Sequence, residues 1–471
     1  RIMAVGARVN DGNGNASGHV RVYEYVHDYD THSWTQLGAD IDGEAAGDTS
    51  GVVSLSSDGL TLAIGANAND GNGNGSGHVR VYHYSGGAWT QRGSDINGEA
   101  ANDYSGNSVS LSSDGSILAV GAWLNDGNGS ESGHVRVYQY SDSSWTQLGG
   151  DLDGEAAQDQ LGYTVALSSD GSILATGARY NSGKGHVRVY QYSGSSWTQL
   201  GADIDGEATG DLFGTSVSLS SDGLTMAAGA QQNDGNGANS GHVRVYKYSS
   251  GTWTKQGADL DGEAEGDGWG AAVQLSSDGL TLVAGAVWND GNGSNSGHVR
   301  VYQYSGSSWT QRGSDINGDA VGDTLGTSVA LSGDGLILVA GTPNNDGNGF
   351  ASGHVQAYRL VGPVFSSSRV FSIQEPQTNL GTVTVVDVDS STSAGNLTFS
   401  VVSGSEFYIN PTAGVLSLTS RSDYETKSSY TAIVTASHGA TSTTQSVTVS
   451  VTNVNDNSAV FTSSATFSAA E

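Results

Sequence analysis

Several residue types that identify common classes of protein are absent or scarce in this sequence of 471 residues. There is no cysteine, which excludes disulfide bonds and thiolate metal sites. Only 18 residues are Lys or Arg, against 48 Asp or Glu, so the formal net charge is −30. Such an acidic surface repels nucleic acid and anionic membranes, which leaves divalent cations and basic partners. No apolar stretch is long enough to span a bilayer, so we expect no membrane insertion within these residues.

One short string, SGHVRVY, recurs with small changes seven times over the first three quarters of the sequence. It places a histidine at intervals of 52 to 59 residues: His19, His78, His134, His186, His242, His298 and His354. A repeat of this length is one supersecondary unit that cannot bury its own apolar face. Its copies must therefore stack into a propeller or a solenoid.

Residues 51–100 show the local structure expected of one repeat. Four runs rich in β-branched and aromatic residues, VVSL, LTLAIGA, HVRVYHY and AWTQ, are separated by turn sequences such as SSDG, NDGNG and SGG. Four hairpin-linked strands per unit are typical of a propeller blade. We therefore predict an all-β fold in which residues 1–360 form a seven-bladed β-propeller.

The first blade is expected to be incomplete. The second and third strands of the repeat occur seven times, but the first and fourth strands occur only six times. The sequence starts in a second strand, RIMAVGA, and the last repeat ends after a third strand, HVQAYRL. Because an unpaired strand edge is open to pairing, we expect residues before Arg1 to supply the missing strands of the first and seventh blades.

The repeats resemble a known family in the order of their motifs. The segment GDLFGTSVSLSSDGLTMAAGA (210–230), followed by GHVRVY, resembles the FG-GAP repeats of the seven-bladed integrin α-subunit propeller. Phenylalanine occupies the Phe-Gly turn only at Phe213, and in the other repeats glycine follows Ser50, Ser105, Leu161, Trp269 and Leu325. Integrin blades often hold calcium between their first two strands. The SSDG hairpin of this chain is too short to surround an ion with about six to eight oxygens, so those sites are not expected here.

The loop between successive blades, DIDGEAAGD, offers a different candidate for calcium. It carries acids at alternate positions, for example Asp203, Asp205 and Glu207, followed by Asp211. Alternate oxygen ligands can converge on one calcium ion. Alternatively, the acids cap turns and pair with an arginine that recurs in the third strand: Arg21, Arg80, Arg136, Arg188, Arg244 and Arg300. We favour the pairing with arginine.

The loop NDGNG, between the second and third strands, is a weaker candidate for a metal site. It offers Asp70, Asn72 and Asn74, but its last residue varies and the fourth repeat has NSGKG instead. Turn formation explains this loop better. The glycosylation pattern N-x-S/T also gathers in this loop, with four of its five matches there, which predicts a glycoprotein: Asn15, Asn74, Asn128, Asn292 and Asn396.

Two aromatic residue types occupy fixed places in the repeat. Seven histidines at one position could form a metal-binding or pH-sensing ring, since imidazole titrates near neutral pH. We favour the simpler interpretation that each histidine begins a third strand and bonds to a neighbouring blade. The tryptophans of six WT pairs are expected to pack between blades, although a carbohydrate-binding role stays open for them: Trp34, Trp89, Trp145, Trp197, Trp253 and Trp309.

From about Val361 the repeat stops, and period-two alternation such as TVTVVDVD and QSVTVSVTNV predicts a β-sandwich. The motifs QEP, DVD, LTFSV, GVLSLTS with DYE, and NVNDN follow one another in the order found in cadherin repeats. Residues 361–457 therefore resemble a cadherin-like (Ig-like) β-sandwich. Residues 458–471 resemble the start of a further cadherin-like repeat.

The cadherin resemblance implies calcium between successive repeats. The ligands that it implies at the far end are Glu375, Asp423, Glu425, Asn453, Asn455, Asp456 and Asn457, with help from Glu471. Asn453 replaces an aspartate of the family, which should weaken the site. At the near end, Asp387 and Asp389 match the family pattern, but no acidic linker precedes them and His438 replaces a usual aspartate. We expect no calcium between propeller and sandwich.

The leading functional hypothesis is a non-enzymatic extracellular structural or adhesion protein. A rigid propeller head would sit on a calcium-stiffened, cadherin-like stalk within a larger surface filament or matrix assembly. Its partners would be glycans or other protein chains, through self-assembly or at a cell surface. Two alternatives are a lectin-like, glycan-binding propeller and a hydrolase or lyase acting at the propeller channel. Catalysis normally breaks repeat symmetry, and no Ser/His/Asp group or phosphate loop stands out, so we expect no enzyme.

Overall fold

The computed structural model describes residues 1–471 except 29–30, 361–363, 366, 387–396, 439–440 and 455–471. It divides into two compact units, Arg1–Arg359 and Leu360–Glu471. The described residues form strands and turns, apart from one short 3-10 helix, η1 (Asn181–Gly183). The all-β fold is therefore confirmed. The predicted start of a further cadherin-like repeat, at 458–471, lies outside the described residues.

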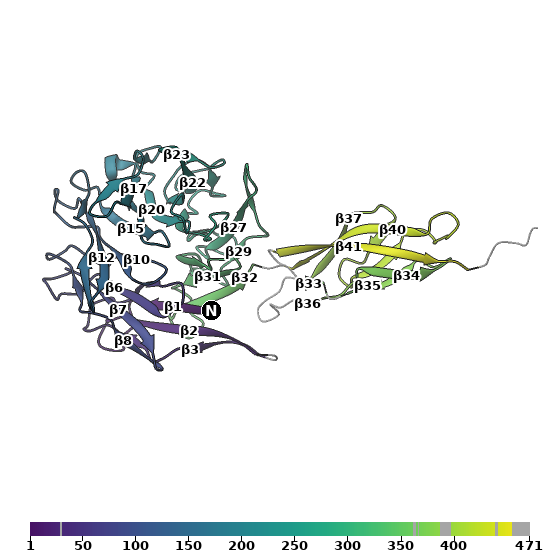
Figure 1. The fold of residues 1–471 in the computed structure, drawn as a ribbon, viewed down its shortest axis with the longest axis horizontal. Coiled ribbons are helices and arrows are strands. Elements are labelled where there is room, and N and C mark those ends of the chain that lie inside the picture. The colour runs from purple at the N-terminus through teal and green to yellow at the C-terminus, as the bar shows by residue number, and fades with distance from the viewer. Residues whose placement is uncertain (29–30, 361–363, 366, 387–396, 439–440, 455–471) are drawn as a thin grey trace, which may run out of the picture. The chain divides into compact units, whose positions relative to one another are not determined.

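The first unit contains seven sheets built from the predicted strands (Figure 1). The first strands are β5 (Val52–Leu55), β10 (Ser108–Leu111), β15 (Leu161–Leu167), β20 (Phe213–Leu219), β25 (Trp269–Leu275) and β30 (Ser328–Leu331). The second strands are β1 (Ile2–Ala7), β6 (Thr61–Ala66), β11 (Ile117–Ala122), β16 (Ile173–Ala178), β21 (Thr225–Ala230), β26 (Thr281–Ala286) and β31 (Ile337–Thr342). The third strands are β2 (His19–Asp28), β7 (His78–Ser85), β12 (His134–Ser141), β17 (His186–Tyr192), β22 (His242–Ser249), β27 (His298–Tyr304) and β32 (His354–Arg359). The fourth strands are β3 (Thr31–Gln36), β8 (Ala88–Gln91), β13 (Ser144–Gln147), β18 (Trp197–Gln199), β23 (Thr252–Lys255) and β28 (Trp309–Gln311).

Strands pair in chain order within each sheet, and every neighbour is antiparallel. Two residues of each inter-blade loop add a short fifth strand beside the start of the third strand, as where Ile204 pairs with Val187. These strands are β4 (Ile41–Asp42), β9 (Ile96–Asn97), β14 (Leu152–Asp153), β19 (Ile204–Asp205), β24 (Leu260–Asp261) and β29 (Ile316–Asn317). The sequence did not predict them, because two residues are too few to show an alternating pattern.

The seven sheets follow one another around a common axis, with the first strands β10, β15 and β20 on the inner side (Figure 1). The second strands are the most deeply buried, and all six residues of β6, β11, β16, β21 and β26 are buried. In the second to sixth sheets, neighbouring sheets cover both faces, as where Val243 and Val245 of β22 pack with Val273 of β25. Burial on both faces explains why these strands are continuously apolar, as in LVAGA.

Paired glycines allow neighbouring sheets to approach closely. Gly229 of β21 faces Gly270 of β25, and a Cβ atom on Gly229 would lie 2.0 Å from the carbonyl oxygen of Gly270. Gly270 also has a φ of +87°, a left-handed conformation that other residues adopt at a cost. The glycine of the Phe-Gly turn is therefore required both by the turn and by packing between sheets.

The first and seventh sheets are linked through Arg1. Its guanidinium lies 2.9 Å from the carboxylate of Asp334, in the hairpin between β30 and β31. Within the described residues, the first sheet has no strand before β1 and the seventh has no fourth strand beside β32. These strand counts match the predicted ones, and the source of the missing strands stays a prediction.

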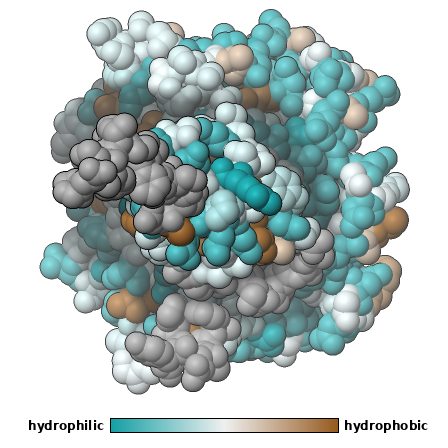
Figure 2. All heavy atoms as spheres, turned by 90° about the vertical axis from the view of Figure 1, so that its right-hand side faces the viewer, coloured by the Kyte–Doolittle hydropathy of each residue, from teal (hydrophilic) through white to brown (hydrophobic). Residues whose placement is uncertain are grey.

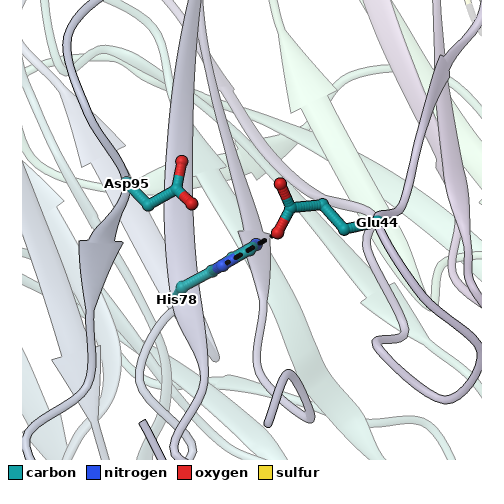
Figure 3. A group of neighbouring side chains, drawn as sticks. All are labelled: Glu44, His78 and Asp95. Carbon is teal, nitrogen blue, oxygen red and sulfur yellow. Dashed lines mark ion pairs between the residues drawn. The ribbon is translucent and has the colours of Figure 1, made fainter. Parts of the chain in front are cut away.

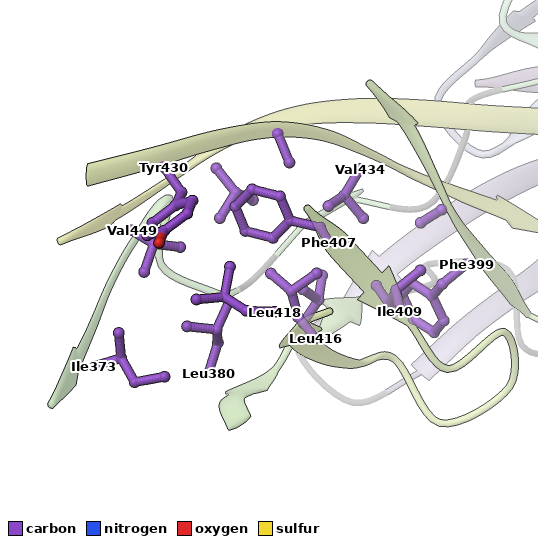
Figure 4. Close-up of a cluster of buried hydrophobic side chains, with 14 of the residues drawn as sticks. Ile373, Leu380, Phe399, Phe407, Ile409, Leu416, Leu418, Tyr430, Val434 and Val449 are labelled. Atoms are coloured by element: carbon purple, nitrogen blue, oxygen red, sulfur yellow. The ribbon is translucent and has the colours of Figure 1, made fainter. Parts of the chain in front are cut away.

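The second unit is the predicted β-sandwich. Its strands are β33 (Val364–Phe365), β34 (Val370–Gln374), β35 (Asn379–Thr382), β36 (Val385–Val386), β37 (Thr398–Ser403), β38 (Phe407–Ile409), β39 (Val415–Leu418), β40 (Ser429–His438) and β41 (Thr441–Thr452). They form the sheets β34-β41-β40-β37, β35-β39-β38 and β33-β36, with β34 parallel to β41. Phe407 and Leu416 of one sheet pack against Tyr430, Val434 and Val449 of another (Figure 4). One apolar core therefore lies between the two larger sheets.

The face of the molecule in Figure 2 is mainly hydrophilic, and its apolar residues form separate small groups. The most exposed large apolar side chains of the described residues include Phe350, at 95%, and Val9, at 74%, which belong to different repeats. A search of the described residues for helices with the length and apolarity of a membrane span found none.

Candidate functional site

The two loops that were weighed as calcium sites bind each other. In the fifth repeat, the side-chain nitrogen of Asn236 in the NDGNG loop donates to the carbonyls of Gly262 and Glu263 in the following inter-blade loop, at 2.8 and 2.9 Å. The carboxylate of Asp234 accepts the main-chain N–H of Asn239 at 2.8 Å within its own loop. These oxygens and amides are committed to loop structure, which agrees with turn formation rather than metal binding in NDGNG.

The acids of an inter-blade loop have different partners instead of converging on one point. Asp203 pairs with Arg188 of its own sheet, whereas Glu207 pairs with Arg244 of the next sheet. Asp211 accepts the main-chain N–H of Ala208 at 3.0 Å. The structure therefore shows the predicted arginine pairing for Asp203 and Glu207 and the predicted turn capping for Asp211.

Four arginines of the third strands are each held between carboxylates of two sheets. Arg244 of β22 is 7% exposed, and its Nε donates to Asp259 of its own repeat at 3.0 Å while Nη2 contacts Glu207 of the preceding loop. Burial acts to raise the pKa of Asp259, but hydrogen bonds from Arg244 and Lys255 outweigh it and lower the pKa to about 2. The same pairing holds Arg136, Arg188 and Arg300. These ion pairs tie neighbouring blades together.

The repeated histidines lie beside these ion pairs. His78 begins β7 and is 1% exposed, and its Nδ1 lies 3.8 Å from the Glu44 carboxylate of the preceding loop, with Asp95 on its other side (Figure 3). Burial lowers the pKa of His78, with a further lowering from the charge of Arg80. All seven histidines therefore start a third strand, as predicted, and five of them lie buried between carboxylates of two blades: His78, His134, His186, His242 and His298.

Groups such as Glu44, His78 and Asp95 bring three possible metal ligands within 4.8 Å of one another, and the group recurs between other blades. In each repeat, however, an arginine reaches the same glutamate, as Arg80 does at 3.5 Å from Glu44. The guanidinium already neutralises the carboxylate and excludes a second cation from it. We therefore assign these groups to the structure of the propeller.

The repeated tryptophans are fixed at the junctions between sheets. The indole nitrogen of Trp253 in β23 donates to the carbonyl of Leu200 in the preceding repeat at 2.8 Å. Matching bonds join Trp89, Trp145, Trp197 and Trp309 to carbonyls of the preceding repeats. The predicted packing between blades is confirmed for these five residues.

The glycosylation patterns in the NDGNG loops fall into two structural classes. Asn15 and Asn74 directly follow the five residues of NDGNG, and both are exposed. Asn128 and Asn292 stand at the fourth position, where the side-chain nitrogen of Asn128 donates to the Gly154 carbonyl at 2.7 Å and Asn292 makes the matching bond at 2.8 Å. The fifth site, Asn396, lies outside the described residues.

We expect any N-glycans on the folded protein at Asn15 and Asn74, and not at Asn128 and Asn292. A glycan is attached through the side-chain nitrogen, which in the second pair already donates to the next loop. Peptide mapping by mass spectrometry after secretion from a glycosylating host would measure the occupancy of each site. Equal occupancy at all four positions would contradict this assignment.

The far end of the sandwich gathers the acids that the cadherin resemblance implies. Glu375 follows β34 and is 4% exposed, and its two carboxylate oxygens accept the main-chain N–H groups of Tyr424 and Val454, the latter at 2.7 Å. The side-chain nitrogen of Asn453 donates to Glu425 at 2.7 Å. These bonds bring three segments that are distant in sequence to one end of the unit.

This acidic group fits a hard divalent cation. Asp423 is exposed, and hydrogen bonds from the side chain and main chain of Thr426 lower its pKa. Within the described part of the chain, Glu375, Asp423 and Glu425 have no ion pair with Lys or Arg. Carboxylate and amide oxygens are the ligands that calcium prefers. The exposed carboxylates of Asp423 and Glu425 therefore fit calcium, whereas both oxygens of Glu375 already accept main-chain N–H groups.

The remaining predicted residues of the sandwich cannot be placed in this site. Asn455, Asp456, Asn457 and Glu471 lie outside the described residues, as do Asp387 and Asp389 at the near end. His438 is the last residue of β40, and its side chain is also outside them. The prediction of no calcium at the near end stays a prediction.

The sequence analysis missed one group of side chains near the inner strands: Arg8, Asn67, Asn107, Tyr163 and Arg179. A chain of contacts joins these residues across four sheets. They stand at positions that differ from repeat to repeat, whereas the motifs of the repeat lie at positions that recur. A comparison of the repeats for their differences would have found them.

Two family descriptions match the sequence. An FG-GAP repeat matches residues 97–138 and 203–246, and a cadherin domain matches residues 369–452. The chain therefore contains FG-GAP repeats followed by a cadherin domain, and both resemblances are confirmed. Such domains are typical of extracellular, adhesion-type proteins and generally mediate contacts between proteins.

One solved structure supports the fold alone. A putative 6-phosphogluconolactonase from Bacteroides uniformis is 11% identical, with a TM-score of 0.51, over 76% of this chain and 91% of its own. TolB from Acinetobacter baumannii is 12% identical, with a TM-score of 0.39, over 68% of this chain and 64% of its own. Human protocadherin-24 EC1-2 is 22% identical, with a TM-score of 0.20, over 22% of this chain and 49% of its own. A search of the curated proteins found no match.

Proposed function

We propose that this chain is a non-enzymatic, extracellular structural or adhesion protein. Its propeller serves as a rigid head, and its cadherin domain is stiffened by calcium within a larger surface filament or matrix assembly. The observation that carries this proposal is the group of acids at the far end of the cadherin domain, where Asn453 bonds to Glu425 and the next residue, Val454, donates to Glu375. Neither carboxylate has a basic partner among the described residues. Cadherin domains generally bind calcium at such acids.

The repeated chemistry of the propeller supports a structural role. Its arginines, acids and histidines recur at the junctions between blades, where they form ion pairs across sheets. An active site needs one constellation of residues rather than five equivalent ones. We therefore assign these residues to the rigidity of the head.

Calcium is expected to stabilise the cadherin domain and to bind through Glu425 and Asp423. At a calcium concentration about 100-fold above Kd, binding adds about 2.7 kcal/mol to the free energy of unfolding. Glu425→Gln and Asp423→Asn should each weaken calcium binding by about tenfold or more, because each removes a charged oxygen ligand. Isothermal titration and scanning calorimetry of the full chain measure both quantities.

Glu406→Gln is the matched control for these variants. Glu406 belongs to the same unit, but its carboxylate is paired with Lys427, so its loss should leave calcium binding unchanged. An adhesive role is tested separately, by coating beads with the full chain and measuring their aggregation with calcium and with chelator. Calcium binding that is equal in all variants would refute the site, and beads that never aggregate or attach would refute the adhesive role.

A further inference from the structure

The seven repeats differ most clearly just after the second strand. The first residue beyond this strand is Arg8, Asn67, Trp123, Arg179, Gln231, Val287 or Pro343, whereas the NDGNG motif that follows is nearly constant. The next residue ranges from Ala68 to Tyr180 and Trp288. Stacking of equivalent blades does not require these residues to differ. A surface that binds an asymmetric ligand does require different residues at equivalent positions.

Contacts of these variable residues run across four sheets. Arg8 of the first sheet donates to the Asn67 side chain at 2.8 Å, and Asn67 donates to the Asn107 side chain at 3.1 Å. Asn107 in turn donates to the main-chain carbonyl of Tyr163 at 3.2 Å. Tyr163 belongs to β15, a first strand on the inner side of the ring (Figure 1). The variable positions of several blades therefore form one continuous site.

Aromatic rings surround Arg179 at the end of this chain of contacts. Its guanidinium carbon lies 3.8 Å from the ring centre of Tyr163, 5.1 Å from that of Trp123 and 4.9 Å from that of Tyr180. Tyr104 lies beside Trp123, with ring centres 6.2 Å apart. Tyr180 is 43% exposed, so part of this aromatic group faces solvent.

Neither Arg8 nor Arg179 has an ion pair with a carboxylate in the described part of the chain. Arg8 bonds to the amide of Asn67, and the Nε of Arg179 donates to the amide oxygen of Gln160 at 3.0 Å. The arginines of the third strands, by contrast, have carboxylate partners, as Arg244 does. Arg8 is exposed, so a ligand can reach its side chain. Two uncompensated arginines in a chain of net charge −30 leave a place for an anion.

We propose that Arg8, Arg179 and the rings around them bind a sugar that carries a carboxylate, such as a uronic acid residue of a glycan. A guanidinium binds a carboxylate through two parallel hydrogen bonds. The negative face of an aromatic ring attracts the C–H groups of a sugar ring, and half-exposed Tyr180 offers such a face. An acidic peptide supplies the carboxylate but not the flat C–H surface. This assignment names a ligand class for the proposed adhesive head and rests on that function.

The test uses short ligands, because the net negative charge of the protein opposes long polyanions. At 0.15 M salt this repulsion is screened beyond about 8 Å. The full chain is titrated with trigalacturonic acid, with its trimethyl ester and with triglutamate. We expect trigalacturonic acid to bind. The uncharged ester should bind at least about tenfold more weakly, because it loses the charge-assisted hydrogen bond. Triglutamate should also bind at least about tenfold more weakly, because it lacks the contact between the sugar and the aromatic ring.

Variants locate the site. Arg179→Gln, Arg8→Gln and Tyr180→Ala should each weaken binding of trigalacturonic acid by at least about tenfold. Arg92→Gln is the matched control, because Arg92 also lies over a tyrosine ring, that of Tyr140 at 4.1 Å, but near Thr61 at the opposite end of a second strand. Thermal unfolding of each variant checks its fold. Tyr180 is half-exposed, so Tyr180→Ala should leave the protein folded. This variant therefore still tests the site if an arginine variant unfolds.

Four results would overturn the proposal: no binding of the acid, equal binding of acid and ester, equal binding of triglutamate, or equal loss in Arg92→Gln. Equal binding of triglutamate would instead assign the site to an acidic protein segment. These titrations need neither calcium nor assembly. Failure here leaves the adhesive role standing, and failure of the bead assay leaves the sugar site standing.

Discussion

Arg244→Met is expected to lower the free energy of unfolding of the propeller by about 3 kcal/mol. The guanidinium of Arg244 is buried between the carboxylates of Asp259 and Glu207, so its removal leaves Asp259, 24% exposed, without its main counter-charge. Glu207 is more exposed and contributes less. Urea unfolding followed by tryptophan fluorescence measures this change in the first unit, because the nine tryptophans of the chain all precede residue 310.

Arg21→Met is the matched control for this variant. Arg21 holds the same place in the first sheet, but its side chain is 44% exposed and it pairs with Asp40. An exposed pair contributes about 0 to 1 kcal/mol, so this variant should cost less than about 1 kcal/mol. If both variants cost the same, ion pairs between sheets do not hold the blades together.

Stability of the propeller is expected to fall as the pH is lowered below 6.5. Burial lowers the pKa of five repeated histidines in the folded state: His78, His134, His186, His242 and His298. Below pH 6.5 the unfolded chain binds protons that the folded chain does not. Stability is therefore complete above pH 6.5 and is lost as the pH falls, with a slope of up to about 1.4 kcal/mol per pH unit for each histidine.

The surroundings of His242 illustrate this balance. His242 is the first residue of β22. Its ring packs against the Phe213 ring in a T-shaped arrangement, with ring centres 6.4 Å apart. Burial, the largest effect, and then Arg244 lower its pKa, while Asp259, Glu207 and Asp261 raise it. Because the net direction is downward, protonation opposes folding. The carboxylate of Asp259, with its pKa lowered to about 2, adds a second loss of stability below about pH 4.

Melting temperature measured from pH 8 to pH 4 tests this prediction. His242→Gln should reduce the steepness of the loss between pH 6.5 and 5, since one proton fewer is bound on unfolding. His19→Gln is a weaker perturbation, because His19 is less enclosed than these five histidines and lies near Asp40 and Asp42. A melting temperature that stays constant from pH 8 to 5 would contradict the prediction.

Much of the architecture was predictable because each repeat carries its own strand and turn signals. The alternation of β-branched residues with SSDG and NDGNG turns gives the four strands, and sevenfold recurrence gives the number of sheets. The pairing of Arg244 with acids was also predictable, because both recur once per repeat. The short strand Ile204–Asp205 was not predictable, because two residues form a strand here only by pairing with the third strand, as Ile204 does with Val187.

In the candidate sites, too, some features could be predicted from the sequence and others could not. The acids Glu375, Asp423 and Glu425 could be selected from the sequence because they stand in the order of a known motif. The distinction between Asn74, which is exposed, and Asn128, which is bonded to the next loop, depends on a neighbour 26 residues away. Sequence alone treats both as the same glycosylation pattern.

The sequence by itself determined the number of repeats, their strands and the residues that recur at each junction, because these follow from local patterns repeated along the chain. Only the tertiary structure decided which carboxylate each arginine meets, and that Arg8 and Arg179 are joined by one series of contacts across four sheets. The physical reason is that stacking of sheets around an axis brings together residues 40 to 59 positions apart at each hydrogen bond of this series, and no local pattern encodes such contacts.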